Sequence, residues 1–333
     1  MAYQNVATPR FYINAVEWAA NSGAYTINRP YFRTLPVSSN MAWDHFAGQN
    51  NSWYFASTPS HIPGWIFTNK SFVALLGHGL SMGDNYQEAK VVDGAGIDMP
   101  QSTLNDIESV NWDNNKIPLP GFSIAHYSLG GHNEVNVMAG GVQPTVGSVI
   151  MGTYYDMPNS PDLSLTLTRE YGGSKSIETK GGHTLTNTYY TKPPKWKNSG
   201  RGAWEVGSAT IENVVSGGDV GLLTKSGRRI WDLSFSYIQD SDIFPDLSNT
   251  GYQINYPDGW TEADGNTILN DDTFYGQVIH RTDGGALPFI FQPDGTNYKP
   301  DQFAICKFDM DSFKFNQVAV GVYSVKLKIR EIW

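Results

Sequence analysis

The clearest fold signal in this chain is Tyr323-Ser-Val-Lys-Leu-Lys-Ile-Arg-Glu-Ile-Trp333, in which apolar and polar residues alternate. A period of two is typical of a β-strand with one face on a core and the other in water. Glu331 is the one polar residue on the apolar side. Termini usually fray unless something holds them, so we expect this stretch to be docked in a sheet or against a partner. The apolar face carries Tyr323, Val325, Leu327, Ile329 and Trp333.

The opposite face of the same stretch is basic and carries Lys326, Lys328 and Arg330. Charged residues on a strand discourage uncontrolled pairing at the edge of a sheet. Together with Trp333, these residues are the first candidates for a contact surface between subunits.

Other stretches show the same alternation. In Leu163-Ser-Leu-Thr-Leu167 the leucines fall on one face, and in Trp231-Asp-Leu-Ser-Phe-Ser-Tyr237 four large side chains are expected on one side. Helical patterns are few. One runs over residues 271–283, with Phe274, Val278 and Ile279 as its apolar stripe, and a second runs from Phe11 to Ala20. The sequence therefore predicts a mainly β protein built of β-sandwich or β-barrel modules with few short helices.

The length of 333 residues suggests two domains. Residues before about 145 are richer in irregular aromatic stretches, and later residues are richer in clean alternating strands. We place a β-rich peripheral domain at 1–145 and a β-sandwich or barrel domain at 146–333, with one short helix near 271–283.

The charge of the chain is low and acidic. Charged residues make up only 17% of it and the net charge is −9, against about 25% charged residues in a typical domain. A surface with so few charges suits a protein that works packed against other subunits. Binding to nucleic acid needs a positive stripe, which is absent. One small basic loop contains Lys192, Lys195 and Trp196 and could contact an acidic partner subunit.

The cysteine content, the first residues and the lengths of apolar runs bear on where the chain is made and folds. The single cysteine, Cys306, cannot form an intramolecular disulfide and is expected to be a small buried apolar residue. The first residues lack a signal-peptide pattern, and no apolar run approaches the ~18 residues that span a bilayer. We expect synthesis in a reducing host cytoplasm and no membrane insertion.

Signals for chemistry are weak. Gly79-Leu-Ser81-Met-Gly83 has the spacing of a nucleophile elbow but lacks the surrounding α/β pattern. His126 and His132 flank a turn without further metal ligands, and the acidic stretch Asp258–Asn266 fails the calcium-loop spacing. We predict no catalytic residue, no metal and no cofactor. Carboxylates paired in space for sugar hydrolysis cannot be read from a sequence, so a polysaccharide depolymerase stays open as a minor alternative.

The aromatic residues have two interpretations. Trp53 and Trp65 could form a sugar-stacking platform, or they could be core and subunit-contact residues, because Tyr and Trp are enriched at protein interfaces.

A family resemblance comes from the later part of the chain. Gly227-Arg-Arg-Ile-Trp-Asp-Leu-Ser-Phe-Ser-Tyr237, Leu287-Pro-Phe-Ile-Phe-Gln-Pro293 and Tyr323–Trp333, with Thr188-Tyr-Tyr-Thr-Lys-Pro-Pro-Lys-Trp196, resemble virion structural proteins of marine tailed bacteriophages. The resemblance covers residues 150–333 and is weak before them. It implies a minor tail, distal tail or baseplate protein.

This resemblance implies a β module that forms rings around the tail axis, with the chain itself and other tail proteins as partners. The expected location is the virion tail, and the expected role is structural and non-enzymatic. The alternative is a receptor- or carbohydrate-binding fibre or decoration protein, which would contact a host-surface glycan.

Overall fold

The computed structural model describes part of the chain, and every structural statement below concerns these residues. They are 5–22, 34, 44–45, 52–57, 70–76, 89–93, 122–127, 135–140, 148–170, 174–188, 228–246, 254–255, 261–262, 268, 271–297 and 302–332.

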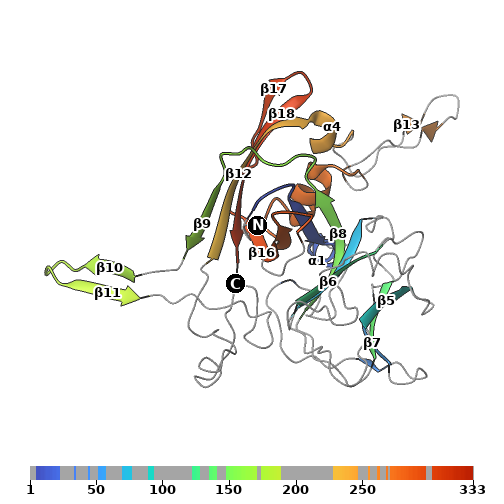
Figure 1. Cartoon of the computed structure of the whole chain (residues 1–333), viewed down its shortest axis with the longest axis horizontal. Helices are drawn as coiled ribbons and strands as arrows, with labels where there is room; N and C mark the ends of the chain where they lie inside the picture. Colours follow the sequence, from blue (N-terminus) through green and yellow to red (C-terminus); the bar gives the residue numbers. More distant parts are fainter. Residues whose placement is uncertain are drawn as a thin grey trace.

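A ten-stranded antiparallel sheet is the largest element of the fold (Figure 1). Its strands follow the order β6-β4-β8-β1-β15-β16-β18-β12-β9, and β17 pairs with β18 beside this path. In chain order they are β1 (Arg10–Asn14), β4 (Ser71–Leu76), β6 (Phe122–Tyr127), β8 (Ser148–Asp156), β9 (Thr166–Glu170), β12 (Arg228–Gln239), β15 (Phe289–Gln292), β16 (Ala304–Phe308), β17 (Phe315–Ala319) and β18 (Val322–Glu331).

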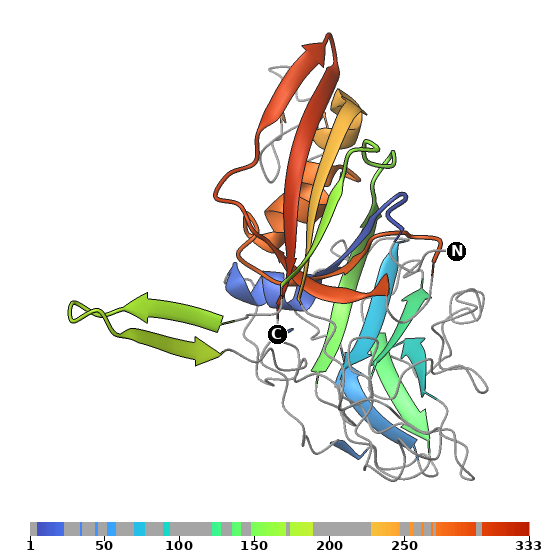
Figure 2. The ribbon, with the colours of Figure 1, turned by 60° about the vertical axis from the view of Figure 1, so that its left-hand side comes forward.

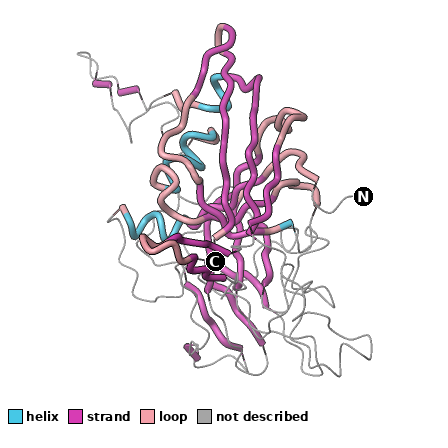
Figure 3. The backbone as a smooth tube through the Cα atoms, turned by 90° about the vertical axis from the view of Figure 1, so that its left-hand side faces the viewer, coloured by secondary structure: helices cyan, strands magenta, loops and turns pink. Residues whose placement is uncertain are grey.

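Three smaller sheets accompany it (Figure 3). A four-stranded sheet has the order β2-β3-β7-β5, and two pairs, β10-β11 and β13-β14, stand alone. These strands are β2 (Asp44–His45), β3 (Ser52–Ser57), β5 (Ala89–Asp93), β7 (Val135–Gly140), β10 (Ser174–Glu178), β11 (Thr184–Thr188), β13 (Ile254–Asn255) and β14 (Thr261–Glu262).

The described helices are short. They are α1 (Ala15–Asn21), α4 (Asp240–Ile243), the π-helical turn η3 (Tyr275–Ile279) and the 3-10 turn η4 (His280–Thr282). The prediction of a mainly β chain with few short helices is confirmed. A sandwich or barrel arrangement stays a prediction, because the strands are assigned to one long sheet and three smaller ones.

The expected helix from Phe11 to Ala20 is wrong in its first half. Phe11–Asn14 belongs to strand β1, and the helix begins at Ala15. The switch occurs at Asn14, whose side chain accepts a hydrogen bond from the backbone N–H of Glu17. This N-cap bond satisfies one of the free donors of the first helical turn.

The helical segment expected near 271–283 is confirmed as the turns η3 and η4. Phe274, Val278 and Ile279 are buried, as the apolar stripe predicts. The segment ends at Asp283, which has a left-handed backbone with φ of 54°, followed by Gly284 with φ of 65°. A left-handed residue is the common way for a helix to end.

Strands β12 and β18 are the longest pair, and two expected apolar faces, one on β12 and one before β9, are corrected by the structure. Trp231, Leu233 and Phe235 are buried, but the register shifts between Phe235 and Ile238, so Ile238 turns inward and Tyr237 is 76% exposed. Such a bulge inserts one residue and reverses the faces that follow. Leu163 is also fully exposed, because strand β9 begins only at Thr166.

The core lies around β1, which is central in the sheet. It pairs with β8 on one side and with β15 on the other. Phe11 packs against the rings of Phe289 and Phe291 at centroid distances of 5.5 and 5.2 Å. On the other side, Gly152 lets β8 come close to β1, since a Cβ there would lie 1.8 Å from the carbonyl oxygen of Ile13.

The large sheet contains strands from both expected domains. β1, β4 and β6 precede residue 145, and the other strands of the sheet follow it. The expected boundary therefore does not coincide with an edge of this sheet. The four-stranded sheet, in contrast, consists only of residues before 145.

Candidate subunit interface

The predicted basic face of β18 is wholly or partly exposed, and two of its three charges are already paired within the chain. Lys328 Nζ lies 3.2 Å from Asp309 Oδ2, and Arg330 Nη2 lies 2.5 Å from Glu170 Oε2. Strand β18 has hydrogen-bonded neighbours on both sides, namely β12 and then β16 or β17. The expectation that this stretch is docked in a sheet is thus confirmed. On the side away from β12, β17 pairs with residues 322–325 and β16 with residues 329–331, and the Lys328 carbonyl between them accepts from the Asp309 N–H. Lys326 is exposed.

Glu331, the polar residue on the apolar face of β18, forms a buried ion pair with Arg229. Glu331 and Arg229 of β12 are both buried, and Arg229 donates to Glu331 from its backbone N–H at 2.9 Å and from Nε and Nη2 at 3.2 Å each. Nη2 also donates to the carbonyl of Phe303 at 3.1 Å. The guanidinium lies 5.0 Å from the ring centroid of Trp231. The one polar residue on the apolar face is therefore neutralised by a partner across the sheet.

The other predicted contact residues are not placed. Trp333, Lys192, Lys195, Trp196 and Trp65 lie outside the described residues. Trp53 lies on β3, where its backbone pairs with Ala139 of β7 and His45 of β2. The proposed aromatic sugar platform is therefore untested. The Ser81 motif and His132 also fall outside the described part, as does most of the acidic stretch 258–266.

Exposed apolar side chains gather on two hairpins that were not predicted as contact surfaces. Of the six large apolar side chains exposed in the described part of the chain, four lie on these hairpins. Val318 and Val320 lie on the β17–β18 hairpin, where Val320 is 95% exposed. Ile177 and Leu185 lie on the β10–β11 hairpin and are 69% and 64% exposed. Figures 1 and 2 both show the two hairpins extending away from the rest of the described chain.

The β10–β11 hairpin has a well-defined register. Ile177 lies directly opposite Leu185, and the hydroxyls of the neighbouring pair Ser176 and Thr186 are 2.9 Å apart. The turn closes with a hydrogen bond from the Gly182 N–H to the Thr179 carbonyl at 2.9 Å. Gly182 has φ of 76°, which favours glycine. The glycine pair at 181–182 was visible in the sequence as a turn signal, but the exposure of the apolar pair was not.

Within the described part of the chain, this hairpin joins no larger sheet. An isolated two-stranded hairpin is at best marginally stable in water, and three strands or a packing partner are usually needed. Its central apolar pair faces solvent instead of a core. The exposed cross-strand pair is therefore a candidate contact surface.

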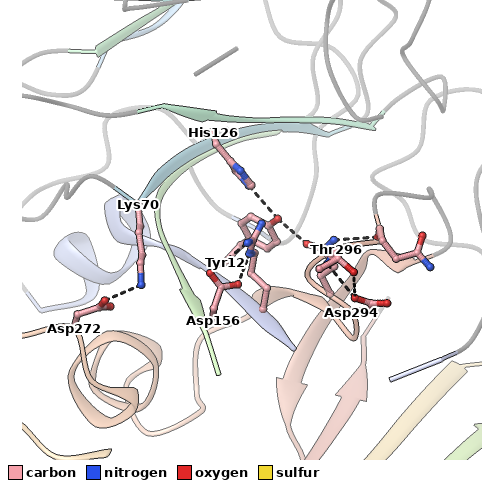
Figure 4. Close-up of polar contacts among 10 residues, drawn as sticks. Tyr12, Lys70, His126, Asp156, Asp272, Asp294 and Thr296 are labelled. Atoms are coloured by element: carbon pink, nitrogen blue, oxygen red, sulfur yellow. Dashed lines mark hydrogen bonds and ion pairs between the residues drawn. The ribbon is translucent and has the colours of Figure 1, made fainter. Parts of the chain in front are cut away.

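A separate polar network joins β1, β6 and β15 (Figure 4). The Tyr12 hydroxyl donates to Gln292 Oε1 at 2.7 Å, and Gln292 Nε2 donates to the Asn297 carbonyl at 3.1 Å. The hydroxyl proton is therefore used, so His126 Nε2, at 3.1 Å from the same oxygen, must act as the donor.

The histidine of this network is unsuited to acid–base chemistry. It keeps some surface exposure, yet its ring stacks on Tyr154 with centroids 4.4 Å apart, and Tyr12 covers it further. Burial, and then the charge of Arg10, lower the pKa of His126 from 6.5 to about 3. The ring therefore stays neutral near neutral pH and cross-links strands β1 and β6 through its one N–H.

The charged members of the same region are paired. Arg10 binds Asp156 through Nε at 2.6 Å and Nη2 at 3.2 Å, across the β1–β8 ladder. Lys70 Nζ lies 2.7 Å from Asp272 Oδ2 (Figure 4). Asp294 accepts from both the N–H and the hydroxyl of Thr296 and so fixes the turn after β15. These contacts are structural cross-links.

Two kinds of chemical group can be assessed among the residues described, namely metal-binding clusters and the cysteine thiol. No set of three histidine, cysteine or acidic side chains there could hold a metal ion. Cys306 is fully buried, as expected, and burial followed by the charge of Glu331 raises the pKa of its thiol well above the ordinary value. A protonated, enclosed thiol is not a nucleophile.

Comparisons of the chain with protein-family models, with curated proteins and with solved structures found no match. Among the described helices, none combines the length and the apolar character needed to cross a bilayer.

Proposed function

We propose that this chain is a structural subunit of a bacteriophage tail, at the distal tail, the baseplate or a minor tail position. It acts through contacts with copies of itself and with other tail proteins, and the virion tail is its location. This role needs no catalytic residue, metal or cofactor.

The observation that carries the proposal is the combination of a broad antiparallel sheet with hairpins that expose apolar side chains. The sheet fixes the hairpin β17–β18 through β12 and β16, while Val318 and Val320 stay uncovered. Monomeric proteins rarely present grouped apolar side chains to water unless a partner covers them. A low charge and the strand-and-turn resemblance to tail proteins support the same interpretation.

The test is the oligomeric state of the full purified chain. We expect light scattering to report a closed oligomer and negative-stain images to show rings with a central channel. A chain that stays monomeric at micromolar concentrations would refute the proposal. A compact trimer that binds glycans on an array, and loses that binding when Trp53 and Trp65 are changed to Ala, would favour the fibre alternative.

A further inference from the structure

We propose that the β10–β11 hairpin is a docking arm that binds a second copy of this chain. The inference rests on the proposed function and names the surface through which that function works. The arm comprises residues 174–188, and its contact centre is the cross-strand pair Ile177 and Leu185.

The arm carries an uncovered apolar pair, Ile177 and Leu185. Both side chains are more than half exposed and lie opposite each other, so they form one continuous apolar spot on one face of the ribbon. The neighbouring pair on the other face, Ser176 and Thr186, is polar and internally hydrogen bonded. Since adjacent residues of a strand point to opposite faces, the apolar pair lies on one side of the arm, between polar residues, and the serine–threonine pair lies on the other. An arm with two such sides is suited to lie against a surface with its apolar side.

The charge of the arm differs in sign from that of the rest of the chain. Residues 174–188 contain two lysines and one glutamate, a net charge of +1, while the whole chain carries −9. The remaining residues therefore carry −10, so a second copy presents an oppositely charged body to the arm. Lys180 and His183 lie exposed in the turn, where they would meet that body first. Complementary charge of this kind favours encounter and fixes orientation.

The arm is small for an interface. A stable pairwise interface usually takes about 20–30 residues from each partner, and the arm offers fewer than that. One arm alone is therefore too small to hold two subunits tightly. When every subunit gives one arm and accepts one, the contacts close into a ring and act together. The small arm thus fits assembly of many copies better than a simple dimer.

The first experiment replaces the apolar pair. In the variant Ile177→Thr/Leu185→Thr the apolar spot is lost, and the β-branched threonine keeps the strand propensity of the hairpin. Sedimentation of the full chain over a concentration series should show subunit association weakened roughly tenfold or more. The matched control is Leu163→Thr, which removes a fully exposed apolar side chain outside the arm and should leave association unchanged.

The second experiment does not depend on the stability of the hairpin. A photo-crosslinking amino acid is placed at position 177 in a mixture of unlabelled and ¹⁵N-labelled full-length chains. We expect crosslinks that join position 177 of one chain to residues outside the arm of a second copy. Such peptide pairs contain one labelled and one unlabelled peptide. Crosslinks found only within one chain would overturn the docking arm.

The two proposals fail in different ways. Rings that form normally with Ile177→Thr/Leu185→Thr, and that give no mixed crosslinks from position 177, refute the arm and leave the tail subunit standing. A chain that is monomeric at every concentration refutes both.

Discussion

The buried Arg229–Glu331 pair gives the sharpest stability prediction. Glu331→Ala removes the acceptor of three hydrogen bonds and leaves the Arg229 guanidinium in a site where its side chain is only 3% exposed. Within the pairings described here, the carbonyl of Phe303 remains as an acceptor for Nη2. Removing one partner of a buried ion pair costs about 3–5 kcal/mol, against a total stability of about 5–15 kcal/mol for a domain. We expect the free energy of unfolding to fall by that amount.

The assay is urea unfolding followed by tryptophan fluorescence, because buried Trp231 lies beside Arg229. The double variant Arg229→Met/Glu331→Leu replaces both charges with apolar side chains and should recover most of the loss. Arg330→Ala is the control on the neighbouring residue, because its pair with Glu170 is partly exposed and contributes about 0–1 kcal/mol. If Glu331→Ala costs no more than Arg330→Ala, or if the double variant is as unstable as the single one, the reasoning is refuted.

Three further predictions concern the core and the polar network. Tyr12→Phe leaves Gln292 Oε1 without its donor and should lower stability by about 1–3 kcal/mol in urea unfolding; an unchanged midpoint would contradict this. The pKa of His126 is about 3 in the folded chain and near 6.5 in the unfolded chain, so the unfolded chain binds the extra proton first. The free energy of unfolding should therefore fall as the pH drops from 6.5 towards 3, by at most about 1.4 kcal/mol per pH unit. The variant His126→Gln should reduce that slope. Gly152→Ala should abolish soluble expression, since its Cβ would overlap the Ile13 carbonyl. Gly182→Ala in the β10–β11 turn has nothing within 4 Å of its Cβ and should remain soluble. It should cost about 1–2 kcal/mol, because alanine is disfavoured in a left-handed backbone.

Local alternation predicts β12 and β18 well, because each strand has one face on the core. The bulge that exposes Tyr237 could not be predicted, since it depends on the register with β18 and not on the residues around it. Glu331 could be recognised as unusual from the sequence alone. Its partner Arg229 could not, because the two residues are 102 positions apart and meet only through strand pairing.

The start of α1 and the β10–β11 hairpin each had a sequence signal other than apolar alternation. The start of α1 is marked by Asn14 with Glu17 three residues later, which is the spacing of a capping box. The β10–β11 arm is marked by the glycine pair at 181–182 between two threonine- and serine-rich runs with one apolar residue each. A strand with so few apolar residues has no face to pack on a core. The low apolar content of both strands was therefore the sequence signal for a projecting hairpin.

The central place of β1 has a consequence for synthesis on the ribosome. Its outer neighbour β15 is translated about 280 residues later, as the Tyr12–Gln292 bond illustrates. At roughly 5–20 residues per second, that interval lasts about 15–60 s. Until β15 is made, β1 can pair with β8 but keeps one unpaired edge. That edge is open to pairing with other nascent chains on the same mRNA. We therefore expect newly made chains to need a chaperone until residue 292 has emerged, and fragments that stop before it to aggregate.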